Sequence, residues 1–134
     1  ARAVRPDSAI AADMIAGFPG ESEAEHQETL ALLKRVEFAK LHVFPYSERE
    51  GTPAASAEHP VNVALRKQRA AEIRDLGREM RQQFLSQQMG KTFPVLVEGN
   101  GTGLSGNYIR MRTGELPEGE VHTVRLTAET LAER

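Results

Sequence analysis

Two short segments of this chain combine an apolar run with residues that suit ligand binding. The first, residues 13–21, ends in the turn Gly17-Phe18-Pro19-Gly20, where two glycines around a proline let backbone amides come close to a ligand. The second, residues 41–52, ends in a loop that carries hydroxyls and the cation of Arg49. We therefore expect the chemistry of this chain at these two places. For the first, the alternative is a tight strand-to-helix turn without a ligand.

The sequence around these segments predicts two successive βα units. Residues 10–16 and 40–44 are apolar runs of strand length, and each stops at a glycine or a proline. Between them, Ser22 and Glu25 form the pattern of a capping box, which begins a helix that continues to about Arg35. Strands joined by helices pair in parallel, and such sheets gather ligands at the carboxyl ends of their strands. Both candidate segments lie at those ends.

The second half of the chain predicts a long helix followed by a β module. Apolar residues recur every three or four positions between residues 62 and 89, and Gly90 is placed to cap this helix in a left-handed conformation. We interpret the many charged residues of the helix as a solvated face with i,i+4 pairs. From Phe93 onward apolar and polar residues alternate, and Asn100-Gly101 predicts a hairpin.

Composition excludes several classes of site. The chain has 134 residues, a net charge of −2 and no cysteine, so its own residues cannot form disulfides, thiolate nucleophiles or cysteine-bound clusters. No apolar run reaches the roughly 18 residues that a membrane helix needs. The first residues do not resemble a secretory signal. We expect a cytoplasmic protein with no membrane partner.

Three further patterns have structural explanations. Residues 101–106 spell a dinucleotide fingerprint, but that fingerprint requires a helix to follow, and the next residues alternate like a strand. The four histidines lack the spacing of metal ligands, so we predict no metal site. The acidic residues at 21, 23 and 25 match the preference of a first helical turn for negative charge, with a functional carboxylate pair as the alternative.

The residues of both candidate segments resemble one enzyme family. Residues 13–22, DMIAGFPGES, are similar to a motif late in the barrel of radical S-adenosylmethionine methylthiotransferases. Residues 41–54, LHVFPYSEREGTPA, resemble the next strand and loop, and are closest to the branch that acts on threonylcarbamoyladenosine in tRNA. Residues 91–126 resemble the TRAM domain, a small β-barrel that binds tRNA. The resemblance covers most of the chain in the order of the family.

The resemblance implies an α/β fold that is part of a larger enzyme. Members have an amino-terminal cluster domain, a radical barrel with a second cluster, and the TRAM domain. Because both clusters use cysteines, we expect this chain to be a carboxyl-terminal fragment that is inactive and binds no cofactor stably by itself. We expect residues 1–61 to form the last βα units of a partial TIM-type radical barrel, residues 62–90 a long connecting helix, and residues 91–134 the antiparallel β-barrel of TRAM.

The resemblance also implies roles for individual residues. The pocket for S-adenosylmethionine is expected to be lined by two strand ends and one turn, namely Ile15, Gly17, Phe18, Pro19, Gly20, Val43 and Phe44. The loop after the second strand is expected to face the mouth of the active site and to bind substrate or the cofactor carboxylate, through Tyr46, Ser47, Arg49 and Thr52. No residue of this chain is assigned a catalytic or metal-binding role.

A second substrate-binding surface is expected in the β module. The spacing of Tyr108, Arg110 and Arg112 predicts that all three lie on one strand face. There the tyrosine can stack on an unpaired base while the arginines bind phosphates. The alternative is an exposed strand face whose charges discourage edge pairing.

The function implied is that of part of a tRNA-modifying enzyme. The complete enzyme would methylthiolate C2 of N6-threonylcarbamoyladenosine next to the anticodon, with S-adenosylmethionine and two [4Fe-4S] clusters as cofactors. The expected partners are the anticodon stem-loop of tRNA and the missing amino-terminal and cluster-binding domains, and we expect a partial barrel to self-associate. The alternatives are the branches that act on isopentenyladenosine or on a ribosomal protein, and a non-catalytic RNA-binding module.

Overall fold

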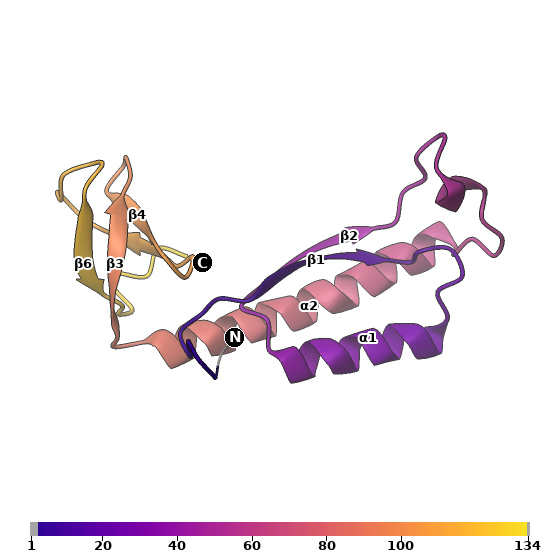
Figure 1. Ribbon diagram of the computed structural model, residues 1–134, viewed down its shortest axis with the longest axis horizontal. Helices are drawn as coiled ribbons and strands as arrows, with labels where there is room; N and C mark the ends of the chain where they lie inside the picture. The colour runs from indigo at the N-terminus through magenta and orange to yellow at the C-terminus, as the bar shows by residue number, and fades with distance from the viewer. Residues whose placement is uncertain (1–2, 134) are drawn as a thin grey trace. The chain divides into compact units, whose positions relative to one another are not determined.

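The computed structural model describes residues 3–133, which divide into two compact units (Figure 1). One unit is Ile10–Gln82. The other combines the described residues of Ala1–Ala9 with those of Gln83–Arg134. No helix within residues 3–133 is long and apolar enough to cross a membrane.

The unit Ile10–Gln82 contains the two predicted strands and the helix between them. Strand β1 (Ala11–Ala16) pairs in parallel with β2 (Lys40–Pro45), in the register that sets Ala16 opposite Pro45. Helix α1 (Glu23–Val36) begins as predicted, because the Ser22 hydroxyl accepts a hydrogen bond from the Glu25 amide at 3.1 Å. It ends at Glu37, which adopts a left-handed conformation. The predicted βα arrangement is therefore confirmed.

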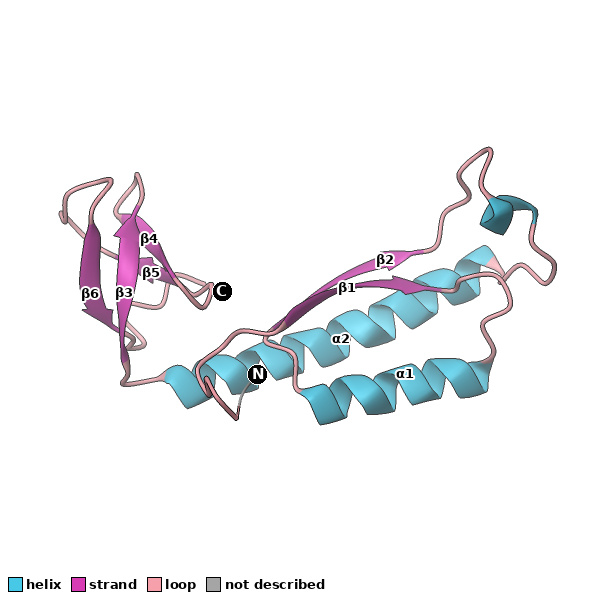
Figure 2. Ribbon diagram, in the orientation of Figure 1, coloured by secondary structure: helices cyan, strands magenta, loops and turns pink. Residues whose placement is uncertain are grey.

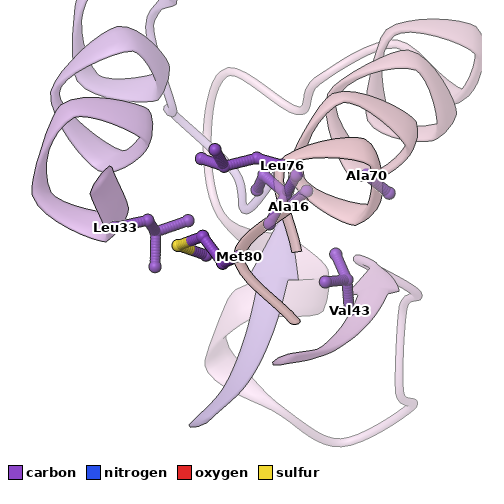
Figure 3. Close-up of a cluster of buried hydrophobic side chains, with 7 residues drawn as sticks. Ala16, Leu33, Val43, Ala70, Leu76 and Met80 are labelled. Carbon is purple, nitrogen blue, oxygen red and sulfur yellow. The ribbon is translucent and has the colours of Figure 1, made fainter. Parts of the chain in front are cut away.

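Both helices of this unit contribute to one apolar core. Helix α2 (Val63–Gln88) supplies Ala70, Ile73, Leu76 and Met80, the stripe predicted from the sequence. Leu33 comes from α1, and the strands add Ala16 and Val43 (Figure 3). At Gly77 the helix lies close to the sheet, since a Cβ there would meet the Leu41 side chain at 3.4 Å.

The opposite face of the two strands is exposed. Ile15 and Phe44 are register partners, and 57% and 56% of their surfaces are accessible. Asp13 and His42, two residues earlier in the register, are exposed on the same face. Parallel sheets are ordinarily covered on both faces. The described residues place helices on one face only, and a TIM-type barrel is not evident in them.

The β module forms a four-stranded antiparallel sheet in the order β5-β4-β3-β6 (Figure 2). Its strands are β3 (Thr92–Val97), β4 (Thr102–Ser105), β5 (Arg110–Arg112) and β6 (Val121–Arg125). The predicted alternation is confirmed, because Phe93, Val95 and Val97 are buried while the residues between them are exposed. The predicted hairpin is also present: Asn100 and Gly101 have φ of 66° and 69°, as a type I′ turn requires.

The closed β-barrel that we expected is not found in the described residues. Strands β5 and β6 do not pair with each other. Instead the chain turns after β6, and Thr130 and Ala132 make backbone hydrogen bonds of 2.6 and 3.0 Å to Arg112 and Arg110. With only three residues, β5 is too short for a full ladder. The sheet is open, and residues 130–132 cover its β5 edge.

The short 3₁₀ helix η1 (Pro53–Ser56) lies in the predicted surface loop between β2 and α2. It buries no residue. Helix α2 begins after Asn62, whose side chain accepts a hydrogen bond from the Ala64 amide at 2.8 Å. It is followed by Gly90 at a φ of 83°, the left-handed residue that the sequence predicted.

Candidate functional site

The structure brings the two candidate segments together at the carboxyl ends of β1 and β2. The Tyr46 amide donates a hydrogen bond to the Ala16 carbonyl at 2.7 Å. The rings of Phe18 and Tyr46 meet edge to face, with centroids 5.4 Å apart. We define residues 17–21 as the first site segment and residues 46–52 as the second.

The first site segment is a turn that only glycine fits at its start. Gly17 has a φ of 77°, and a Cβ there would lie 2.4 Å from the Arg66 Cγ. Its amide donates a hydrogen bond to a Glu21 carboxylate oxygen at 3.1 Å. The Gly20 amide donates to the His59 carbonyl at 2.8 Å. The turn is thus held by specific backbone contacts at both of its glycines.

Arg66, in the first turns of α2, holds the second site segment. Its side chain is buried, and its three nitrogens donate to the Val61 carbonyl, the Tyr46 carbonyl and the Glu48 carboxylate at 2.7, 3.3 and 2.6 Å. The guanidinium also lies over the Tyr46 ring, 5.1 Å from its centroid. The hydrogen bond from Arg66 lowers the pKa of Glu48, and the same contact raises the pKa of Arg66. Arg66 therefore fixes the start of the second site segment, at Tyr46 and Glu48.

Arg69, one turn further along α2, holds the first site segment. One guanidinium nitrogen donates to both the Glu21 carbonyl and the Glu21 carboxylate, at 2.8 and 2.9 Å. The same carboxylate oxygen accepts the Gly17 amide. A longer contact of 3.4 Å reaches Glu23, whose pKa is lowered chiefly by a hydrogen bond from Gln27 and further by the charge of Arg69. Arg69, Glu21 and Gly17 thus form one connected chain of hydrogen bonds.

These two arginines were missed by the sequence analysis, which assigned them to a solvated face. That interpretation holds for Arg78, which is exposed and pairs with Asp75. It is wrong for Arg66 and Arg69, which are 4% and 3% exposed. Arg66 lies four residues before Ala70 and Arg69 four residues before Ile73, so both extend the apolar stripe towards the helix amino terminus. This spacing was the signal available in the sequence.

The residues expected to line a cofactor pocket do not all share one face. Ile15, Phe18 and Phe44 are exposed at the strand ends, near Gly17 and Gly20. Pro19 is half-buried in the turn. Val43 lies on the opposite side of β2, where it packs in the core with Ala16 (Figure 3).

The second site segment offers polar groups to the solvent. Ser47, Arg49 and Thr52 are exposed, and the Thr52 hydroxyl donates to the Arg49 carbonyl at 2.7 Å. Among residues 3–133, no group hydrogen-bonds to the Tyr46 hydroxyl, although that oxygen is buried. A buried hydroxyl without a protein partner is uncommon in folded proteins.

In the β module, we expected Tyr108, Arg110 and Arg112 to lie on one strand face. This expectation is wrong for Tyr108. Arg110 and Arg112 share the exposed face of β5. Tyr108 precedes the strand and has a φ of 61°, because the backbone turns between Ser105 and Ile109, where the Ser105 hydroxyl accepts the Ile109 amide at 3.0 Å. Tyr108 is nevertheless 60% exposed.

Both arginines of β5 already have partners. The Arg110 guanidinium pairs with the Glu98 carboxylate at 2.6 Å, and Arg112 donates to the Glu129 carbonyl at 2.9 Å. Arg110 and Glu98 are both more than two-fifths exposed, so the pair is a surface interaction of small energy.

The described residues contain no group of three or more histidine, aspartate or glutamate side chains that could hold a metal ion. His26 illustrates the structural use of the histidines. It is buried, and its Nε2 lies 2.8 Å from the Glu72 carboxylate, linking α1 to α2.

No protein-family model matches the chain, but it is similar to curated enzymes. It is 43% identical over 100 residues to tRNA-2-methylthio-N(6)-dimethylallyladenosine synthase of Maricaulis maris, covering 75% of this chain and 22% of that protein. It is 40% identical over 112 residues to threonylcarbamoyladenosine tRNA methylthiotransferase MtaB of Rickettsia prowazekii, covering 83% and 26%. With MtaB of Thermotoga maritima the identity is 34% over 130 residues, covering 93% and 30%. The chain thus spans less than a third of the length of these relatives.

Proposed function

The chain belongs to the radical S-adenosylmethionine methylthiotransferase family, and we propose that it is part of a longer tRNA methylthiotransferase. Its identity to the three relatives described above is 34–43% over most of its residues. Because the alignments cover only 22–30% of those proteins, the activity is proposed for the complete enzyme. The chain itself, without cysteine, is proposed to be inactive.

The observation that carries this proposal is the exposed apolar surface at the strand ends. Ile15 and Phe44 lie side by side there, each more than half accessible, beside the Gly17 turn. Aliphatic and aromatic side chains suit the faces of a purine ring. Gly20, in the same turn, is exposed. These residues fit the adenine of S-adenosylmethionine, and Phe18 extends the same surface.

We propose that the complete enzyme also contains the barrel strands that cover this face. When bound, S-adenosylmethionine and the [4Fe-4S] clusters supply the radical chemistry at C2 of the adenosine. The residues of this chain bind and orient the cofactor and the substrate. Ser47, Arg49 and Thr52 offer hydroxyls and a fixed cation, which suit a phosphate or a carboxylate. The clusters would be held by cysteines elsewhere in the complete enzyme, since this chain has none.

The β module is proposed to bind tRNA as a TRAM-type domain, at the anticodon stem-loop. Tyr108 is exposed enough to stack on an unpaired base. Arg110 and Arg112 lie on one exposed face, where they can take phosphates. The surface ion pair of Arg110 with Glu98 costs little to exchange for a phosphate contact.

For the substrate we propose threonylcarbamoyladenosine. The alignments with the two MtaB enzymes cover 83% and 93% of this chain, against 75% for the dimethylallyladenosine synthase of Maricaulis maris. The higher identity to that synthase, 43%, favours isopentenyladenosine as the second candidate.

The test is methylthiolation by the complete enzyme, with its clusters reconstituted, of two tRNAs that differ in the modified adenosine. We expect product from tRNA carrying threonylcarbamoyladenosine and none from tRNA carrying isopentenyladenosine. The reverse result would assign the second candidate. No product from either tRNA, by an enzyme with a full complement of iron, would contradict the proposed activity.

A further inference from the structure

We propose that Arg66 and Arg69 are positioning residues with separate tasks, Arg66 for substrate binding and Arg69 for cofactor binding. The inference rests on the proposed function, which assigns the first site segment to S-adenosylmethionine, and it goes further in choosing a tRNA phosphate, rather than the cofactor carboxylate, as the ligand of the second. The two arginines lie three residues apart on α2, and both are buried. Neither is assigned a contact with a ligand. Each acts through the segment that its guanidinium holds.

Among residues 3–133, the guanidinium of Arg66 hydrogen-bonds only to the second site segment and to the chain that leads into α2. Its donors reach Tyr46 and Glu48 in the loop, and Val61 just before the helix. Its contact with the first site segment is made by a different part of the side chain, the Cβ and Cγ that pack against Gly17. A change that keeps these carbons and removes the planar fork therefore acts directly on the loop, and its route to the first site segment is the Tyr46 ring, which meets Phe18.

Within the part of the chain that the structure describes, the guanidinium of Arg69 hydrogen-bonds only to the first site segment and to the first turn of α1. It holds the Glu21 carbonyl and carboxylate, and through the carboxylate it fixes the Gly17 amide. Its third contact is Glu23. Among the described residues, its Nε has no partner although it is buried, so its hold on Glu21 comes from the terminal nitrogens.

Arginine is required at both positions because each side chain donates in several directions from one plane. Lysine carries the same charge, but it is a single flexible donor centre and cannot reproduce a fixed fork. In the case of Arg66, three acceptors on three different residues are spanned at once. Lysine substitution therefore keeps charge and most of the aliphatic stem while releasing the segment.

The experiment compares Arg66→Lys and Arg69→Lys in the complete enzyme with reconstituted clusters. The matched control is Arg78→Lys, on the same helix but exposed and paired with Asp75. Two dissociation constants are measured for each protein, one for S-adenosylmethionine by equilibrium dialysis and one for an anticodon stem-loop RNA by filter binding. Both readouts are independent of turnover.

We expect a crossed pattern. Arg66→Lys weakens RNA binding about tenfold and leaves cofactor binding within about twofold, while Arg69→Lys does the opposite. Arg78→Lys changes neither. A purely structural role would lower both affinities together in both variants, and that result would overturn the inference.

Two milder variants keep the test valid where a lysine variant fails to fold. Glu48→Gln removes the charge from the exposed partner of Arg66, and Glu21→Gln weakens the partner of Arg69. The same crossed pattern is expected from them in smaller measure, and its absence would overturn the inference. A wild-type enzyme that binds neither ligand would instead overturn the proposed function.

Discussion

Gly17 and the two buried arginines set the geometry of the candidate site residue by residue. Gly17 has a left-handed φ of 77° and leaves space that the stem of Arg66 fills. Glu21 joins Gly17 to Arg69 through one carboxylate oxygen. That oxygen therefore ties the start of the turn to a buried guanidinium.

Glu48 makes the contribution of the second site segment to stability depend on pH. The hydrogen bond from Arg66 lowers the pKa of Glu48 below its ordinary value of 4.5. Because the folded-state pKa is depressed, the contact stabilises the fold above the unfolded-state pKa. That contribution is lost as the pH falls through the lower folded-state pKa.

We expect Glu48→Gln to lower the melting temperature of this chain slightly at about pH 7, and to have a smaller effect at a pH well below 4.5, the ordinary pKa of the carboxyl. The effect is small because the Glu48 side chain is 52% exposed. Glu50→Gln, which removes a charge from the same exposed loop, is the control. Thermal unfolding followed by circular dichroism measures the difference, and an equal effect of Glu48→Gln at both pH values would contradict the prediction.

At the scale of elements, the strands and helices follow from short-range patterns. The alternation in β3, the positive-φ hairpin at Asn100-Gly101 and the capped start of α1 were all predictable from the sequence. The turn that removes Tyr108 from β5 was not, because period-two spacing in residues 108–112 is compatible with either arrangement. The open sheet also depends on long-range pairing, which a local pattern does not encode.

The backbone turns of the candidate site could be predicted from the sequence, but the buried arginines that hold them could not. Glycine and proline mark turns by their own conformational limits, so both site segments were found from sequence. Arg66 and Arg69 were missed because a pattern of polar and apolar residues counts arginine as solvent-facing. Burial of arginine depends on acceptors from other elements, here the carbonyls of Tyr46 and Glu21.

Where β3 pairs with β4, Gly103 leaves no space for a side chain. Gly103 lies opposite Val97, and a Cβ there would lie 2.6 Å from both the Leu96 carbonyl oxygen and the Val95 Cγ1. A Cβ at the exposed Gly106 would meet nothing within 4 Å. Neither glycine has a positive φ, so the two differ in space and not in backbone strain.

We expect Gly103→Ala to lower the free energy of unfolding by about 1–3 kcal/mol, because the added methyl group overpacks a buried strand pair. Gly106→Ala, the matched control, should change it by less than about 1 kcal/mol. Urea denaturation of the two variants provides the comparison. Equal stability of both would show that the sheet moves to accept the methyl group.

At the scale of the whole molecule, the unit Ile10–Gln82 leaves one sheet face uncovered. Its two strands pair only with each other among the described residues, and both helices contribute to the core on one face. The relatives are more than three times as long as the aligned segments, which leaves ample chain to complete a barrel in the proposed enzyme. In isolation, the exposed Ile15 and Phe44 remain available for association.

We expect this chain to self-associate when purified alone, because an uncovered apolar face and unpaired strand edges favour contact between copies. Multi-angle light scattering over a range of concentrations tests this. The double variant Ile15→Ser with Phe44→Ser should shift the population towards monomer. A wild-type chain that stays monomeric at the highest concentration would contradict the prediction.

The most direct test of the central claim is nucleoside mass spectrometry of total tRNA from the source strain, with and without the gene for the complete enzyme. We expect the methylthio group to disappear from threonylcarbamoyladenosine alone, and to return with the wild-type gene and less with Arg49→Ala. Loss from isopentenyladenosine alone would keep the enzyme class and change its substrate. An unchanged methylthio content in both nucleosides would contradict the account.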